Sequence, residues 1–141
     1  MTDYAPEFLL GAYAGEGNTT TFQLGSGTVN PGDMVKLTSS AASQVSTVAP
    51  VASSGDPVIG VVQRVWTAMG VSWVSVVMKG IVKMTAGAAI SVGAKVKAST
   101  QTLVVAAVIG TDPITAIFGT ALQAASANGD YILVAVETTA A

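Results

Sequence analysis

The stretch Asp56-Pro57-Val58-Ile59-Gly60-Val61-Val62 reads as a turn that leads into an apolar strand with a glycine in its middle. A similar unit returns at Ile117-Phe118-Gly119-Thr120-Ala121-Leu122. Because both turns are followed by the same order of apolar and glycine positions, the chain contains one pattern twice.

Glycines extend this match outward in both directions. Three pairs occur in the same order, with an offset of 61 residues for the first and 59 for the other two: Gly32 with Gly93, Gly60 with Gly119, and Gly70 with Gly129. The first glycine of each set is followed three residues later by Val-Lys. These matches predict two similar halves, with a possible internal duplication of residues 28–80 and 90–137, although two copies are too few for a solenoid.

Strand signals dominate both halves. Residues 58–66 and 71–78 are the strongest expected strands, and residues 67–70 read as the hairpin between them. Shorter strands are expected at residues 34–38, 45–48, 81–85, 95–98, 103–108, 117–123 and 131–137, with Gly80 breaking the run before residue 81. The alanine-rich residues 114–127 could suggest a helix, but a mid-helix glycine costs about 1 kcal/mol. The pattern predicts an all-β fold, a small and mostly antiparallel β-barrel or sandwich.

Residues 1–27 differ from the rest because five glycines interrupt them. Residues 7–13 and 19–24 are their strand-like pieces. We therefore expect an extended N-terminal arm at residues 1–27, followed by a single β domain at residues 28–141. An arm of this kind either frays or pairs with the edge of a neighbouring sheet.

The composition indicates that much of the surface is covered in an assembly. Half of the 141 residues are hydrophobic and only 10% are charged, whereas roughly 25% are charged in an ordinary soluble domain. Contiguous apolar surface normally marks an interaction site. The simplest partners are other copies of the chain or a larger structure.

Catalytic chemistry finds little support in the residue types. The chain has no cysteine and no histidine, which removes the thiol nucleophile, the usual general base and the commonest metal ligand. Asp56 and Asp112 precede prolines and Asp130 follows Asn-Gly, as expected of turn residues. We expect no enzyme, no catalytic residue, no cofactor and no metal.

Nucleic acid and membrane are equally poor candidates as partners. The net charge is −2 with only six Lys and Arg residues, and phosphate binding needs a basic surface. No apolar run approaches the roughly 18 to 20 residues of a membrane span, and the N-terminus lacks a signal-like segment. We expect synthesis in a cytoplasm without export.

The order of these motifs resembles the capsid decoration, or head cement, proteins of tailed bacteriophages. The resemblance covers roughly residues 28–137 and rests on the Gly-x-x-Val-Lys units, on Val58-Ile59-Gly60-Val61-Val62, on Gly119-Thr120-Ala121-Leu122 and on Gly129-Asp130-Tyr131-Ile132. The N-terminal arm fits it loosely, and residues 39–54 depart from the pattern, which leaves the outer surface undefined.

The resemblance implies a structural virion protein. Such proteins sit on the outer surface of the expanded head, where they assemble as trimers and join neighbouring subunits of the major capsid protein. Contact with the capsid would then come from arm residues, namely Tyr4, Pro6, Phe8, Leu9, Leu10 and Tyr13. Contact between copies would come from the central hairpin, through Val62, Trp66, Trp73 and Val76.

Two other functions remain open at this point. Trp66 and Trp73 flank the hairpin, and tryptophan serves as a core or interface anchor, but it can also stack on sugars. A virion or cell-surface adhesion module that binds glycans is therefore the alternative. A hydrolase is a weaker one, since it would need an unrecognised site such as Ser72 or Ser75 with Lys79.

Overall fold

The computed structural model describes residues 13–38 and 47–137, and their side chains from residue 19 onward. Within this part the chain forms nine β-strands and one short 3₁₀ helix, η1. The strands are β1 (Tyr13–Leu24), β2 (Met34–Thr38), β3 (Thr47–Pro50), β4 (Gly60–Ala68), β5 (Val71–Ala86), β6 (Lys95–Ala98), β7 (Leu103–Ala106), β8 (Gly119–Ala121) and β9 (Tyr131–Glu137), and η1 is Ile114–Ala116.

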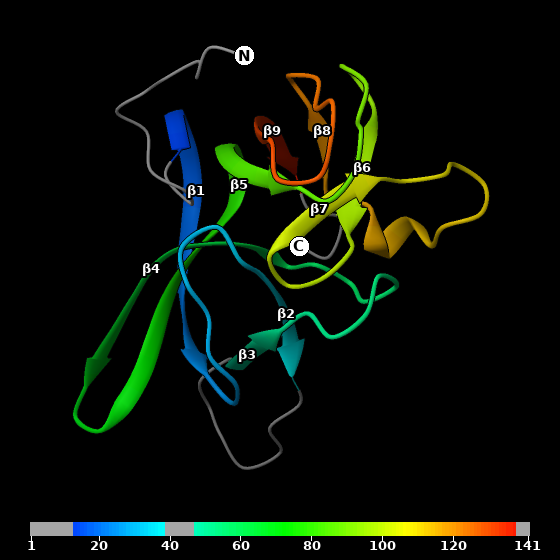
Figure 1. Cartoon of the computed structure of the whole chain (residues 1–141). Coiled ribbons are helices and arrows are strands. Elements are labelled where there is room, and N and C mark those ends of the chain that lie inside the picture. The colour runs from blue at the N-terminus through cyan, green and yellow to red at the C-terminus, as the bar shows by residue number, and fades with distance from the viewer. Residues whose placement is uncertain (1–12, 39–46, 138–141) are drawn as a thin grey trace.

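One sheet contains all of these strands, in the order β1-β3-β2-β4-β5-β7-β6-β8-β9. Two additional pairings, β1 with β5 and β5 with β9, close it into two rings that share β5 (Figure 1). The strands β1, β3, β2, β4 and β5 form the first ring, and β5, β7, β6, β8 and β9 form the second. The fold is therefore two small β-barrels fused along one long strand.

The two barrels repeat each other pairing by pairing. The antiparallel pairs β2–β3, β2–β4 and β4–β5 return as β6–β7, β6–β8 and β8–β9. The parallel pair β1–β3 returns as β5–β7. The register agrees as well, because Val35 lies opposite Gly60 as Val96 lies opposite Gly119. The expected all-β fold with two similar halves is confirmed, and its origin in an internal duplication stays a prediction.

Strand β5 runs without a break through Gly80, contrary to the expected interruption there. Gly80 pairs with Val136 of β9 and has a φ of +150°, a value that glycine adopts more easily than residues with a side chain. Backbone pairing with β1 on one side and β9 on the other continues past this point. A local strand breaker is therefore overridden by the two neighbours that share β5.

Two hydrophobic clusters fill the barrels. The cluster of the first barrel includes Val35, Val62 and Val76. The cluster of the second barrel includes Val96, Phe118 and Val134 from the second half. It also takes in five residues of the first half, Met34, Val51, Val58, Val61 and Val77. The cluster of the second barrel is therefore continuous across the two halves, and burial of each such side chain contributes on the order of 1.5–3 kcal/mol.

Other sequence expectations fit the fold in part. The expected strands at residues 34–38, 95–98 and 131–137 have those bounds in the structure. Residues 13–24, which we expected within the arm, form β1 and pair with β5 of the same sheet. Residues 1–12 lie outside the described residues, so the boundary between an arm and a domain at residue 27 stays a prediction.

Candidate interaction surfaces

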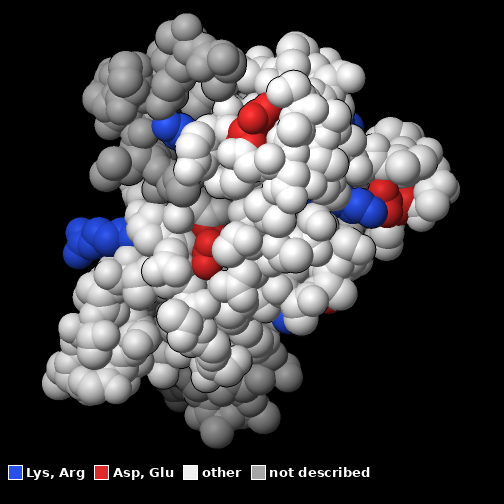
Figure 2. Space-filling view, viewed as in Figure 1, with Lys and Arg blue, Asp and Glu red and all other residues white. Residues whose placement is uncertain are grey.

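Charged groups are sparse and are used mainly to hold loops. Figure 2 shows a face that is largely uncharged, with acidic and basic side chains in a few separate places. The ion pairs in the described part of the chain include Lys36 with Asp56 and Lys97 with Asp112. They occupy matching positions in the two halves, because each lysine follows the same Gly-x-x-Val motif and each aspartate precedes a proline.

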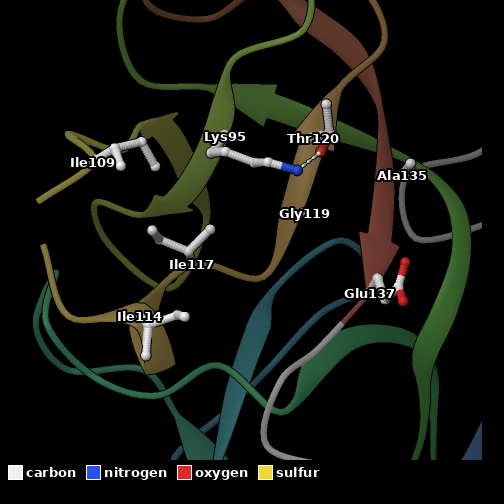
Figure 3. Close-up of a pocket in the computed structure, with 8 residues that line it drawn as sticks. All are labelled: Lys95, Ile109, Ile114, Ile117, Gly119, Thr120, Ala135 and Glu137. Carbon is white, nitrogen blue, oxygen red and sulfur yellow. Dashed lines mark hydrogen bonds between the residues drawn. The ribbon is translucent and has the colours of Figure 1, made fainter.

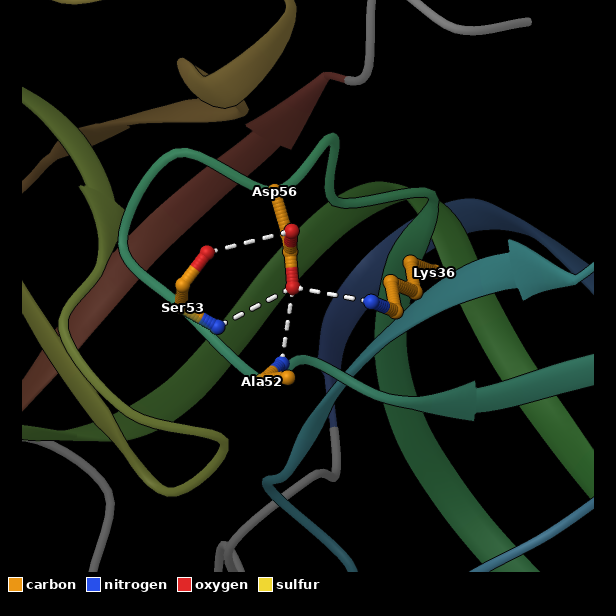
Figure 4. A network of polar contacts seen from close by, with 4 residues as sticks. All are labelled: Lys36, Ala52, Ser53 and Asp56. Carbon is orange, nitrogen blue, oxygen red and sulfur yellow. Dashed lines mark hydrogen bonds and ion pairs between the residues drawn. The ribbon is translucent and has the colours of Figure 1, made fainter.

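Asp56 organises the turn that precedes β4 (Figure 4). Its Oδ2 accepts hydrogen bonds from the Ala52 N–H at 2.8 Å, the Ser53 N–H at 3.0 Å and the Lys36 ammonium at 3.0 Å. Burial alone would raise the pKa of Asp56, but these donors outweigh it and lower the pKa to about 2. The carboxylate therefore acts as a turn cap, which is a structural role.

Asp112 does the same work in the second half. The Lys97 ammonium donates to its Oδ1 at 2.6 Å, and the Val108 N–H donates to its Oδ2 at 2.6 Å. The Lys97 hydrogen bond and then the Val108 N–H lower the pKa of Asp112 below its ordinary value. These bonds tie the loop at residues 107–118 to β6. Hydrogen bonds from the Ser126 N–H and hydroxyl likewise lower the pKa of Asp130 in its own turn.

The first exposed apolar surface is the outer end of the β4–β5 hairpin, residues 63–75, which we call the Trp hairpin. It projects from the body of the chain in Figure 1. Trp66 lies directly opposite Trp73, both are half-buried, and the Arg64 guanidinium lies 4.7 Å from the centre of the Trp66 ring. The turn places Met69 at the tip, where it is fully exposed.

The second apolar surface is a groove of about 500 Å³ on the outer side of β6, β8 and β9, which we call the isoleucine groove. Figure 3 shows Ile109, Ile114 and Ile117 on one side of it and Glu137 at the end of β9. Lys95 reaches across to donate a hydrogen bond to the Thr120 hydroxyl at 3.0 Å. Ile109 is 69% exposed and Ile114 is 72% exposed, so the groove has an unusually apolar wall.

Comparison with known proteins identifies the family. A family model described as phage cement protein matches residues 15–136, most of the chain. The chain belongs to the phage cement protein family. This membership makes it a structural protein of a phage virion head, located on the capsid and binding to it, and the family is one of structural proteins rather than of enzymes.

The fold of this cement-family chain also resembles a solved structure, the head fiber gp8.5 N base in bacteriophage phi29. The TM-score is 0.57 with 15% sequence identity, over 85% of this chain and 93% of that chain. At this identity the likeness concerns the fold alone. Among curated protein sequences nothing matches the cement-family chain.

The structure places the residues that we expected between copies in two different environments. Trp66 and Trp73 are half-buried on one face of the Trp hairpin. Val62 and Val76 have no exposed surface, because they pack in the core of the first barrel of this cement-family chain. Of these four residues, only the two tryptophans are available to a second copy, and we do not propose the two valines as contact residues.

The residues expected to contact the capsid lie mostly outside the described part of the cement-family chain. This holds for Tyr4, Pro6, Phe8, Leu9 and Leu10. Tyr13 is the first residue of β1, and its backbone pairs with Val82 of β5. Its role in capsid contact stays a prediction.

Sequence reasoning missed the isoleucine groove altogether. Ile109, Ile114 and Ile117 surround the Thr111-Asp112-Pro113 turn, and no helix or strand period marks them as one surface. A usable signal was available, since two isoleucines that flank a turn-forming Asp-Pro are unlike the polar residues that turns prefer. The structure shows that this loop is folded back toward β6, because the Lys97 ammonium donates to Asp112 and the N–H groups of Ala107 and Phe118 donate to β6 oxygens.

Within residues 13–38 and 47–137, no group of three or more acidic, histidine or cysteine side chains could hold a metal ion. The same described part of this cement-family chain contains no helix that is long and apolar enough to cross a membrane.

Proposed function

We propose that the chain binds the outer surface of the expanded phage head, where it cements neighbouring subunits of the major capsid protein, and that it does so as a trimer. The observation that carries the proposal is the pair of exposed apolar surfaces on a fold whose two halves share a hydrophobic cluster. Unpartnered apolar side chains such as Met69, Ile109 and Ile114 are costly in water and favour docking.

The double barrel suits a clamp because its two halves are joined by a shared strand and by shared packing. Strand β5 belongs to both barrels, and five apolar residues of the first half pack into the core of the second. Stress applied to one barrel is therefore carried into the other through packed side chains and shared backbone hydrogen bonds. Many copies, each with modest affinity, would together reinforce a shell strongly through avidity.

The N-terminal residues are proposed to make the capsid contact. Residues 4–13 include Tyr4, Pro6, Phe8 and the Leu9-Leu10 pair, which could add a strand to the edge of a capsid sheet by backbone hydrogen bonding. Because Tyr13 already pairs with Val82, a deletion that tests the arm has to stop at residue 12 to spare β1.

Co-sedimentation with undecorated heads tests the function. We expect saturable binding of the full chain to expanded heads and no binding to unexpanded ones, with a copy number in multiples of three. Native mass spectrometry of the unbound fraction gives the assembly state. Absence of binding to both head forms contradicts the proposed function.

A deletion of residues 2–12 then separates the arm from the barrel. We expect the truncated chain to keep its circular dichroism spectrum and assembly state but to lose binding to expanded heads. The matched control replaces the same residues with a Gly/Ser segment of equal length, which keeps the reach without the apolar side chains. Unchanged binding by the truncated chain would mean that the capsid contact lies elsewhere.

A second candidate function is supported by the paired, half-buried Trp66 and Trp73. Neighbouring aromatic faces are suited to stacking on sugar rings, so the hairpin could serve a glycan-binding adhesion module. A glycan array with the full chain and with Trp73→Ala separates the two functions. Specific glycan signals that the substitution removes would favour adhesion.

A further inference from the structure

The repeated fold allows the outer faces of the two barrels to be compared row by row. In the first half, Met34 lies opposite Val61, and Val61 lies opposite Val77, across β2, β4 and β5. In the second half, the equivalent row across β6, β8 and β9 consists of Lys95, Thr120 and Ala135. The two rows therefore occupy the same position on the two barrels.

These rows differ completely in burial. Met34, Val61 and Val77 each have 0% exposure, because the second half of the chain covers them and includes them in its core. A polar anchor fixes this cover: the Gln101 backbone oxygen accepts from the Met34 N–H at 2.7 Å, and its side-chain amide donates to the Asp33 carboxylate at 3.0 Å. The outer face of the first barrel is thus an internal docking surface.

The row of the second half is the floor of the isoleucine groove. Lys95, Thr120, Ala135 and the neighbouring Glu137 all line it, and Lys95 and Glu137 are exposed. No further barrel follows in the described part of the chain to cover this face as the first one is covered. The position that serves for internal docking on the first barrel is therefore open on the second barrel, where its row is more polar and the three isoleucines supply the apolar wall.

The Trp hairpin is present in the first half only. The last equivalent pairs are Val62 with Val76 and Ala121 with Val134. Beyond them the first half continues to the pair of Ala68 with Val71, whereas β8 ends at Ala121. Since the second barrel closes without such an extension, the Trp hairpin is not needed to close a barrel.

The tip of the Trp hairpin carries a residue that does not suit its backbone. Met69 has a φ of 56° and is followed by Gly70 with a φ of 77°, which is the pattern of a two-residue turn that favours Asn-Gly or Asp-Gly. A fully exposed methionine in the left-handed region is unfavourable for the isolated chain. Residues that break a local rule are expected at functional sites.

We propose that the Trp hairpin of one copy docks in the isoleucine groove of the next. This inference rests on the self-association included in the proposed function and names the two surfaces that make it. Arg64 is the only charged residue between Asp56 and Lys79. Glu137 is the acidic residue at the groove, whose other charged residue, Lys95, donates a hydrogen bond to Thr120. The hairpin and the loop at residues 107–118 point to different sides of the chain in Figure 1, so the contact is head-to-tail, which can close into a ring.

Sedimentation equilibrium of the purified chain tests this contact with substitutions that spare the fold. Ile114→Glu places a charge on the groove wall at a side chain that is 72% exposed. Met69→Asn suits the turn and removes only the apolar tip. Each is expected to raise the dissociation constant of the oligomer at least about tenfold. Val92→Glu, at an apolar residue that is 66% exposed and outside the groove, is the matched control and should associate like the wild type.

An exchange of the two charges between Arg64 and Glu137 is the decisive test. Arg64→Glu and Glu137→Arg should each weaken association, and the double variant should restore it, whereas substitutions that merely disturb the fold would add up. Thermal unfolding of every variant verifies that the barrels are intact. Failure of the double variant to recover overturns the proposed contact.

Three further results would overturn the contact, and they separate it from the proposed function. If Ile114→Glu associates as strongly as the wild type, the contact between copies lies on another surface. If Ile114→Glu associates normally but no longer binds expanded heads, the capsid occupies the groove instead. A wild-type chain that stays monomeric would exclude the contact, while its saturable binding to expanded heads would still support the cement function.

Discussion

Gly60 and Gly119 occupy the same position in the two barrels. Each lies so close to a backbone carbonyl oxygen that no side chain fits between them. A Cβ on Gly60 would lie 2.5 Å from the Val77 oxygen, and a Cβ on Gly119 would lie 2.5 Å from the Ala135 oxygen. The oxygens belong to β5 and β9, the strands that pair with β4 and β8. The repeated glycine is therefore the point at which each barrel brings two backbones together.

Alanine at either glycine should destabilise the chain. We expect Gly60→Ala and Gly119→Ala each to cost about 2–4 kcal/mol, because a backbone oxygen obstructs the Cβ at both positions and cannot move aside as a side-chain end can. At Gly60 the Val76 Cγ1 obstructs it as well. Urea unfolding followed by circular dichroism measures the loss. Gly55→Ala is the control, since a Cβ there meets nothing within 4 Å; equal stabilities of the three variants would contradict the close approach.

Stability should fall in acid through the turn aspartates. The pKa of Asp56 is about 2 in the folded chain against an ordinary 3.8, so its ionised form stabilises the fold above pH 3.8. This contribution is lost as the pH falls from 3.8 toward 2, and Asp112 and Asp130 act in the same direction. The unfolding midpoint should therefore drop across this range.

The variant Asp56→Asn isolates one of these groups. Its stability deficit relative to the wild type should be largest at pH 6 and should shrink steeply as the pH falls to 2, because the folded wild-type carboxylate becomes protonated around its pKa of about 2. Thermal unfolding at intervals between pH 6 and pH 2 gives the two curves. A deficit that is independent of pH would show that the loss comes from geometry rather than from charge.

Gln101→Ala should loosen the joint between the two halves. Its side-chain amide donates to the Thr28 backbone oxygen and to the Asp33 carboxylate, both at 3.0 Å, and Asp33 is 4% exposed. Loss of this donor should cost about 1–3 kcal/mol, because a buried carboxylate loses a partner. The neighbouring exposed Thr102→Ala should change stability by less than about 0.5 kcal/mol. Chemical denaturation compares the two, and equal effects would contradict the anchor.

Tryptophan fluorescence should report the state of the hairpin. Trp66 and Trp73 are the only two tryptophans of the chain, and both are half-buried in the single copy. If association covers them, dilution below the dissociation constant should shift the emission maximum to longer wavelength as water reaches the rings. Trp73→Phe keeps one reporter and serves as the comparison. A maximum that is independent of concentration would exclude these residues from the contact.

Local sequence patterns were sufficient to predict strand bounds and turn residues where apolar runs and turn chemistry agree. The bounds of β2, β6 and β9 follow from short apolar runs that begin after turn residues. The turn roles of Asp56, Asp112 and Asp130 also follow from local chemistry, because aspartate caps backbone N–H groups only a few residues away.

Local patterns could not predict which strands pair over long range or which chain covers an apolar face. Gly80 reads as a strand breaker, yet it lies within β5 because β1 and β9 hold the backbone on both sides. Val62 and Val76 read as interface residues, yet they are buried within one barrel. An apolar side chain has the same signature whether its own chain or another chain covers it.

The sequence by itself determined the fold class of the protein, because its strand signals and its repeated Gly-Val units specify a β fold with two similar halves. The tertiary structure alone decided which copy of the repeated face is covered. Met34, Val61 and Val77 are buried by the second half, while Lys95, Thr120 and Ala135 line an open groove. The reason is physical, since burial depends on which side chains lie opposite a face in space, and the local sequence of a strand does not specify them.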